Sequence, residues 1–141
     1  MKSIEKNNLI FIKMDPNEDI HKNIIEISKK HKIKTGIIIS GIGQIKNFTL
    51  GYFNQKNTYL PTNFKKPYEL LALSGNIITK QDEKLLHLHA TCSDENKKTI
   101  GGHLINAKVN VTAEIVVLKT NIDITRKKNN KTGLESLYIT K

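Results

Sequence analysis

Helical periodicity is confined to one short segment of this sequence, and strand-type segments fill most of the chain that follows. The helix is expected to start at Asp15-Pro16-Asn17-Glu18, where Asp15 can cap it and Pro16 suits the first helical position. Isoleucines at i, i+4 and i+7 then form one apolar face, and the helix is expected to end near His31. This order of elements predicts an α+β fold, with one capped N-terminal helix packed on a largely antiparallel sheet of about six or seven strands.

The expected strands are rich in β-branched and other apolar residues and are bounded by turn signals. They cover residues 7–14, 36–40, 48–53, 68–79, 84–93, 109–120 and 122–126. Gly41-Ile42-Gly43 is interpreted as a turn, residues 59–67 as a loop, and Asp94-Glu95-Asn96-Lys97 as a polar turn. Since no repeat, linker or composition break divides the chain, residues 1–141 are expected to form a single domain.

The formal net charge of +10 raises the possibility of nonspecific DNA binding through a lysine surface. Arg126 is the only arginine, so the chain is poorly equipped for bidentate readout of base edges. The alternative is a solvated lysine surface without a specific partner. No apolar run is long enough to span a membrane, and Cys92 is the only cysteine, so we expect a cytoplasmic protein without an intrachain disulfide.

Two histidine segments, His87-Leu88-His89 and Gly101-Gly102-His103, carry the clearest chemical signal. Side chains two apart on a strand share a face, so His87 and His89 are expected to project together. The two glycines allow a close backbone approach that could aim His103 at the same point. Three neutral imidazoles suit Zn²⁺ and leave a fourth position for water or a ligand. The alternative is a set of half-exposed polar histidines with no metal.

Other candidates depend on weaker signals. Glu114 lies in an apolar strand and could orient an imidazole or act as a general base, and Glu69 could do the same. Both carboxylates could equally lie on the solvent-exposed face of a strand. Cys92 is expected to face the core, and His21 and His31 are expected to be surface residues of the helix.

Several segments, read in order, resemble the PPC (plants and prokaryotes conserved) family. They are Ile39-Ser40-Gly41-Ile42-Gly43, Tyr68-Glu69-Leu70-Leu71-Ala72-Leu73-Ser74-Gly75, His87-Leu88-His89, Gly101-Gly102-His103-Leu104, Thr112-Ala113-Glu114-Ile115, and Arg126 followed by Thr132-Gly133-Leu134. The resemblance covers almost the whole chain and implies an α+β fold assembled as a homotrimer.

The resemblance also implies that a metal, usually zinc, is held by His87, His89 and His103. Candidates for residues around the metal ligands, or for a ligand pocket, are Glu114, Glu69, Gly101, Gly102 and Arg126. Family members are commonly labelled DNA-binding proteins. The Arg-Gly-Arg-Pro segment that plant relatives carry for A·T-rich minor grooves is not in this sequence.

Three functions follow as hypotheses. The favoured one is a DNA-binding or regulatory module that is trimeric and contains the three-histidine metal site. The alternative is a zinc-dependent enzyme or small-molecule sensor that uses the open position of the same site. In the third, the histidines are structural groups at the trimer interface. The sequence identifies neither a substrate nor a small-molecule ligand.

Overall fold

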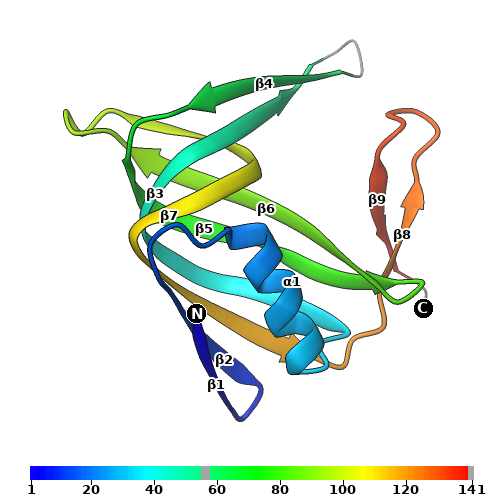
Figure 1. The fold of residues 1–141 in the computed structure, drawn as a ribbon. Coiled ribbons are helices and arrows are strands. Elements are labelled where there is room, and N and C mark those ends of the chain that lie inside the picture. The colour runs from blue at the N-terminus through cyan, green and yellow to red at the C-terminus, as the bar shows by residue number, and fades with distance from the viewer. Residues whose placement is uncertain (55–57, 140–141) are drawn as a thin grey trace.

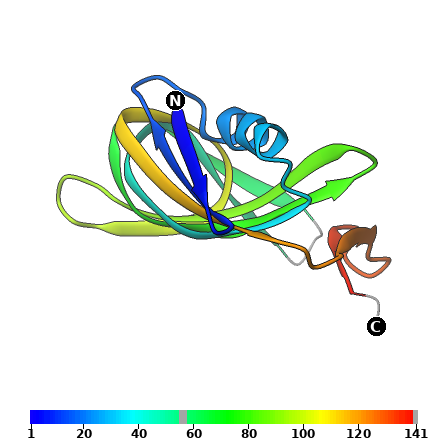
Figure 2. The same cartoon turned by 90° about the horizontal axis from the view of Figure 1, so that it is seen from below.

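The computed structural model describes residues 1–54 and 58–139. Over these residues the elements are β1 (Lys2–Lys6), β2 (Leu9–Met14), α1 (Ile20–Lys30), β3 (Thr35–Phe53), β4 (Tyr59–Phe64), β5 (Tyr68–Lys80), β6 (Glu83–Ser93), β7 (Thr99–Thr120), β8 (Thr125–Lys128) and β9 (Glu135–Tyr138) (Figure 1). Seven of these strands form one sheet in the order β1-β2-β7-β6-β5-β3-β4. A further pairing of β7 with β3 curls the sheet onto itself, as the view from below shows (Figure 2).

The expected α+β class is wrong, because the fold is mostly β. Helix α1 has 11 residues, whereas β3 and β7 have 19 and 22. The expected antiparallel sheet of six or seven strands agrees with the main sheet, which has seven strands, while β8 and β9 form a separate sheet. The Gly101-Gly102-His103 segment and the expected strand at 109–120 are not separate, because both belong to the continuous strand β7.

Two segments that were interpreted as irregular are strands. Residues 59–64 form the edge strand β4, where Pro61 is tolerated because one side of an edge strand needs no ladder partner. Gly41-Ile42-Gly43 lies inside β3, between two shifts in the register with β7, rather than in a turn. The glycines therefore mark bulges that bend a long strand.

The helix begins later than the sequence signals predicted. Asp19, rather than Asp15, is the N-cap and accepts a hydrogen bond from the Lys22 amide at 2.9 Å. The chain cannot become helical at Pro16, because the Asn17 amide and the Glu18 carbonyl are hydrogen-bonded to Val109 on β7. Residues 16 and 17 form a turn, and this pairing delays the start of the helix until after Asp19.

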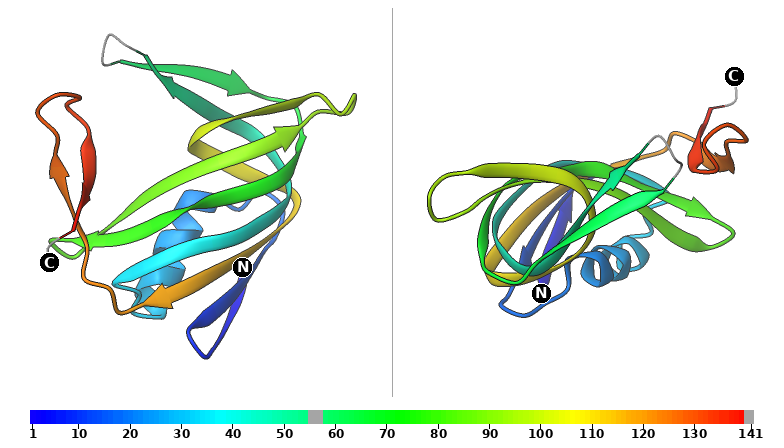
Figure 3. Two further views of the ribbon diagram at one scale, coloured as in Figure 1. Left: turned by 180° about the vertical axis from the view of Figure 1, so that it is seen from behind. Right: turned by 90° about the horizontal axis from the view of Figure 1, so that it is seen from above.

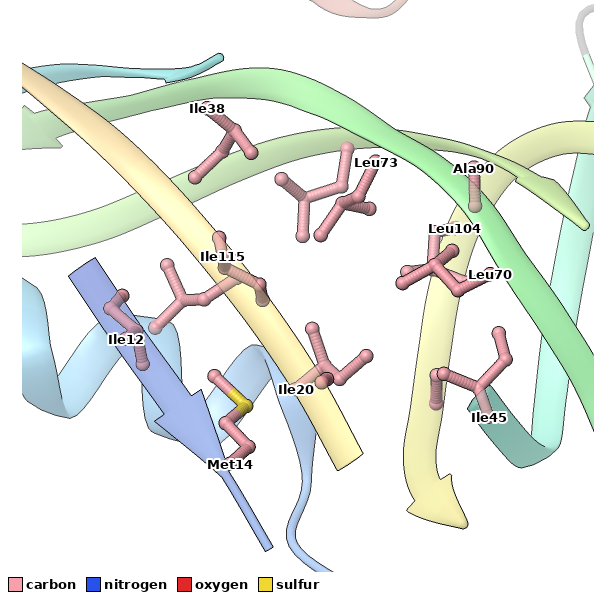
Figure 4. Close-up of a cluster of buried hydrophobic side chains, with 14 of the residues drawn as sticks. Ile12, Met14, Ile20, Ile38, Ile45, Leu70, Leu73, Ala90, Leu104 and Ile115 are labelled. Atoms are coloured by element: carbon pink, nitrogen blue, oxygen red, sulfur yellow. The ribbon is translucent and has the colours of Figure 1, made fainter. Parts of the chain in front are cut away.

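A single cluster of buried apolar residues fills the space between the curled sheet and α1. Figure 4 shows side chains from β2, α1 and the longer strands pointing into this cluster, among them Ile12, Ile20 and Leu73. Cys92 is fully buried, which confirms that it faces the core. Among the described residues, no helix is long and apolar enough to cross a membrane.

The last two strands form a separate two-stranded sheet. Strands β8 and β9 pair with each other, and the views from behind and from above show their hairpin standing beside the main sheet (Figure 3). The expected last strand at 122–126 is therefore shifted to Thr125–Lys128, and Gly133 lies in the hairpin turn. The hairpin is the element that carries Arg126.

Candidate metal centre

Three histidines from two neighbouring strands converge on one outward face of the sheet. The register pairs His89 on β6 with His103 on β7, and His87 shares their face because it lies two residues from His89. One ring nitrogen of each histidine lies within 4.8 Å of the others, and the Nε2 atoms of His87 and His89 are 3.1 Å apart. The alternating residues Leu88 and Ala90 are buried in the core. Strand alternation thus separates the donor atoms from the apolar side chains.

Glycines let the backbones carrying these histidines approach their neighbours closely. Gly75 on β5 has a φ of +154°, and a Cβ there would lie 2.0 Å from the His87 carbonyl oxygen. A Cβ on Gly102 would lie 3.0 Å from the Gly51 carbonyl oxygen. A Cβ on Gly101 would lie 3.0 Å from the Ala90 carbonyl oxygen. The Gly101-Gly102 pair therefore allows β7 to run tightly between β6 and β3 beside His103.

Burial and neighbouring positive charge favour the unprotonated form of His87 and His103. Burial, followed by smaller contributions from the neighbouring His87, His89 and His21, lowers the pKa of His103 to about 4. Burial also lowers the pKa of His87, with a smaller contribution from the positive charge of Arg126. The neutral imidazole is the form that binds metal ions, so the lowered pKa values of His87 and His103 favour coordination at neutral pH.

One atom of the cluster remains unsatisfied. The Nδ1 atom of His103 is buried and has no hydrogen-bond partner among the residues that the structure describes. A buried polar atom without a partner costs free energy unless a further group satisfies it. An unsatisfied nitrogen in a set of three imidazole donors fits a site for a borderline metal ion such as Zn²⁺.

A cleft of about 440 Å³ adjoins the histidines. Its lining residues come from β4, β5, β6, β7 and the C-terminal hairpin, and they are Tyr59, Lys80, Gln81, Glu83, Leu85, Leu86, His87, His103, Arg126, Leu134 and Glu135. The rings of Tyr59 and His103 are 5.3 Å apart between centroids. The registers join β6 to β7 only at residues 89–93 of the described chain, so the cleft opens where the two strands diverge.

Arg126 reaches this cleft from β8. Its guanidinium donates to the Asn76 side-chain oxygen at 2.7 Å and to the Glu135 carbonyl oxygen at 2.8 Å. Asn76 is the cross-strand partner of His87. The predicted pocket residue Arg126 therefore lies beside the histidine cluster.

The two predicted carboxylates lie elsewhere. Glu69 is at the start of β5, where it accepts a hydrogen bond from the Gln44 side chain at 2.6 Å. Glu114 is exposed on β7, opposite Lys13 and Ile42 on the neighbouring strands. The structure thus does not bring either glutamate to the histidines.

His21 and His31 are more than surface residues of the helix. His21 is half-buried and its Nε2 lies 3.0 Å from the Leu104 carbonyl oxygen, and His31 contacts the Glu5 carboxylate at 2.9 Å. The sequence predicted no role for the cleft residues Tyr59 and Leu134 or for Asn76, which binds Arg126. No local signal could have found them, because they are brought together by pairing between distant strands.

A sequence profile identifies the family of this chain. The sequence profile of the Plants and Prokaryotes Conserved (PCC) domain matches residues 1–121. A curated relative, the bifunctional protein GlmU of Synechococcus sp. (strain JA-3-3Ab), is 26% identical over 132 residues. The match covers 92% of this chain but 20% of that protein, so the chain spans about a fifth of this relative's length.

Solved structures share the fold over nearly the whole chain. A candidate DNA-binding protein of Bacteroides thetaiotaomicron has a TM-score of 0.92 and 29% identity, over 98% of this chain and 96% of its own. A plant- and prokaryote-conserved protein of Pyrococcus horikoshii has a TM-score of 0.84 and 30% identity, over 99% of this chain and 95% of its own. A metal-containing protein of Archaeoglobus fulgidus has a TM-score of 0.84 and 26% identity, over 95% of each chain.

Proposed function

The chain belongs to the Plants and Prokaryotes Conserved (PCC) domain family, as its motifs predicted, and on this premise we propose that it is a regulatory binding module with a three-histidine metal site. The observation that carries the proposal is the convergence of ring nitrogens from His87, His89 and His103 within 4.8 Å of one another. Zn²⁺ matches this donor set, and the relative from Archaeoglobus fulgidus is described as metal-containing. A bound zinc ion would supply a Lewis acid to a ligand in the adjoining cleft.

Elemental analysis tests the metal site directly. The protein is purified without chelator, and zinc per chain is measured before and after incubation with zinc and removal of the excess. We expect about one zinc per chain in the wild type and a loss of zinc in His87→Ala and His103→Ala. His31→Ala is the matched control, because His31 lies beside Glu5 rather than in the cluster. A wild-type protein that takes up no zinc contradicts the proposal.

We also propose that the module assembles as a homotrimer through the exposed face of β1, β2, β7 and β3. Ile4, Phe11 and Ile42 are 70%, 57% and 50% exposed, and Ile4 pairs with Phe11 across the strands. They line a groove of about 400 Å³ that also contains Lys2, Lys13 and Glu114. Contiguous apolar surface of this kind usually marks an interaction site, and the mixed charges suit self-complementary contact.

Nonspecific DNA binding is a second candidate function, favoured by the position of four lysines. The exposed pairs Lys65-Lys66 and Lys97-Lys98 lie at the same end of the sheet, where Lys66 and Lys97 line one cleft. The relative from Bacteroides thetaiotaomicron is described as a candidate DNA-binding protein. Such lysines attract phosphates without reading sequence.

Fluorescence anisotropy with a labelled duplex tests the second function. We expect binding that weakens steeply as salt rises, and a clear further loss when Lys66 and Lys97 are both changed to Glu. Lys29→Glu with Lys128→Glu is the control for total charge, because both residues are exposed on other elements. Equal affinity for the two double variants would assign binding to overall charge alone. A complex that persists at high salt would contradict the nonspecific mode.

A further inference from the structure

The cleft beside the histidines contains a buried cation that forms no ion pair with a carboxylate among the described residues. Arg126 is 8% exposed, and both acceptors of its guanidinium are neutral, the Asn76 amide oxygen and the Glu135 carbonyl oxygen. The Glu135 carboxylate instead pairs with Lys80 at 2.7 Å. A guanidinium carries five N–H donors, so these two bonds leave others available to a ligand.

The guanidinium lies close enough to the histidines for one small molecule to contact both. Arg126 is bonded to Asn76, which is the cross-strand partner of His87. The positive charge of Arg126 contributes to lowering the pKa of His87, as expected of neighbouring groups. Arg126, His87 and His103 all line the same cleft.

The charges of the cleft favour an anion once the histidines hold a divalent ion. Lys80 and Arg126 contribute two positive charges to the lining, and Glu83 and Glu135 contribute two negative ones. These four charges balance, so a metal ion on neutral imidazoles leaves the cleft positive. The forked guanidinium then suits a two-oxygen anionic group.

The rest of the lining is apolar and restricts the kind of anion. Leu85, Leu86 and Leu134 line the cleft together with the ring of Tyr59. A volume of about 440 Å³ falls in the range of small-molecule sites. An apolar body joined to an acidic group would match both parts of this surface.

We propose that this cleft binds a small organic carboxylic acid, with its carboxylate between Arg126 and the histidine cluster and its apolar body against Leu85, Leu86 and Leu134. The inference rests on the proposed metal site, because the metal ion supplies the excess positive charge. The fraction of protein with an occupied cleft would accordingly rise with the concentration of such an acid. Arg126 is the residue that would donate hydrogen bonds to the carboxylate.

Isothermal titration calorimetry of the zinc-loaded protein with benzoate tests this inference. Zinc content is measured first for every variant, so that loss of metal is separated from loss of the acid. We expect one benzoate per chain and an affinity reduced by about tenfold or more in Arg126→Gln, since charge-assisted hydrogen bonds are lost. Lys128→Gln removes the same charge from an exposed site on β8 and is expected to bind benzoate like the wild type.

A second variant tests the site if Arg126→Gln does not fold. Leu134 is half-buried in the hairpin turn, and Leu134→Asp would place a negative charge at the cleft without removing the Arg126 hydrogen bonds. We expect it to weaken benzoate binding while zinc content stays unchanged. Inorganic phosphate is titrated in parallel, and we expect it to bind more weakly than benzoate because it has no apolar body.

The outcomes separate this inference from the proposed function. Zinc loading without benzoate binding, or benzoate binding unaffected by Arg126→Gln and Leu134→Asp, would overturn the carboxylate site and leave the metal site standing. Phosphate that binds as tightly as benzoate would overturn the assigned ligand class. A protein that takes up no zinc removes the proposed function, and with it this inference.

Discussion

His89 on β6 and His103 on β7 are direct cross-strand partners, and their ring centroids lie 5.4 Å apart. Each residue is positioned by its own strand, so the distance between them depends on the register of the pair. A shift of one residue would turn one imidazole toward the core, because side chains alternate between faces. The candidate metal site therefore depends on backbone pairing as much as on the histidines themselves.

Changing Gly75 to Ala should destabilise the pairing of β5 with β6. A Cβ at this position would lie 2.0 Å from the His87 carbonyl oxygen, so the strands must separate. We expect the free energy of unfolding in urea to fall by about 2–4 kcal/mol. Ser74→Ala, at an exposed position on the same strand, should change it by less than about 0.5 kcal/mol. An unchanged free energy of unfolding in Gly75→Ala would show that the strands adapt without cost.

Truncating Phe48 should open a cavity in the core. The ring is 1% exposed, stacks on Phe64 at 4.8 Å between centroids and meets the edge of Tyr68 at 5.3 Å. We expect Phe48→Ala to lower the free energy of unfolding by about 3–5 kcal/mol in urea titrations. Tyr52→Ala is the control, because Tyr52 is 71% exposed. Similar losses in both variants would contradict the packing described for Phe48.

The Cys92 thiol should be inert in the folded protein. Burial raises its pKa to about 11, and the residue is fully buried. The reactive thiolate is therefore scarce and inaccessible at pH 8. We expect negligible reaction with a chromogenic disulfide reagent in buffer, and reaction of about one thiol per chain in denaturant. Rapid labelling without denaturant would mean that the core around Cys92 opens readily.

The Glu5 carboxylate should make the stability of the fold depend on acidic pH. Hydrogen bonds from His31 and then from Lys119 lower the pKa of Glu5 below its ordinary value of 4.5. The stabilisation that the ionised Glu5 carboxylate gives the fold is therefore present above about pH 4.5. It is lost as the pH falls through the lower pKa that Glu5 has in the folded state. We expect Glu5→Gln to be less stable than the wild type at pH 6, with the difference shrinking toward pH 3.

Thermal unfolding between pH 3 and pH 7 measures this difference. Glu26→Gln is the matched control, because Glu26 is exposed on α1 and makes no ion pair among the described residues. The melting temperature of Glu26→Gln should change with pH in parallel with that of the wild type. If the difference in melting temperature between Glu5→Gln and the wild type stays constant across this pH range, ionisation of the Glu5 carboxylate is not its cause.

An aspartate at Phe11 should disrupt the proposed trimer. Phe11 is 57% exposed and lies opposite Ile4 and Val116 on the apolar face. A buried unpaired charge is costly at an interface, so Phe11→Asp should shift the mass measured by light scattering from three copies to one. Ile122→Asp, at a 58% exposed site outside this face, should keep the wild-type mass. A wild-type protein with the mass of one chain would refute the assembly.

Local patterns predicted the parts of the fold that depend on near neighbours in the chain. The apolar face of α1, the strands at 68–79 and 84–93, and the inward side chain of Cys92 all follow from spacing along the sequence. His87 and His89 share a face for the same reason. Periodicity of this kind is set within a few residues, so it can be read without knowing the partners of a strand.

Only the tertiary structure decided the features that depend on distant pairing. The pairing of residues 17–19 with Lys108 and Val109 moved the start of the helix, and the continuity of β7 overturned the α+β class. The register of β6 with β7 brought His103 to His89, and the C-terminal hairpin brought Arg126 to Asn76. Sequence by itself determined which side chains point together on each strand. Which strands lie side by side, and in which register, depends on long-range packing that no local pattern specifies.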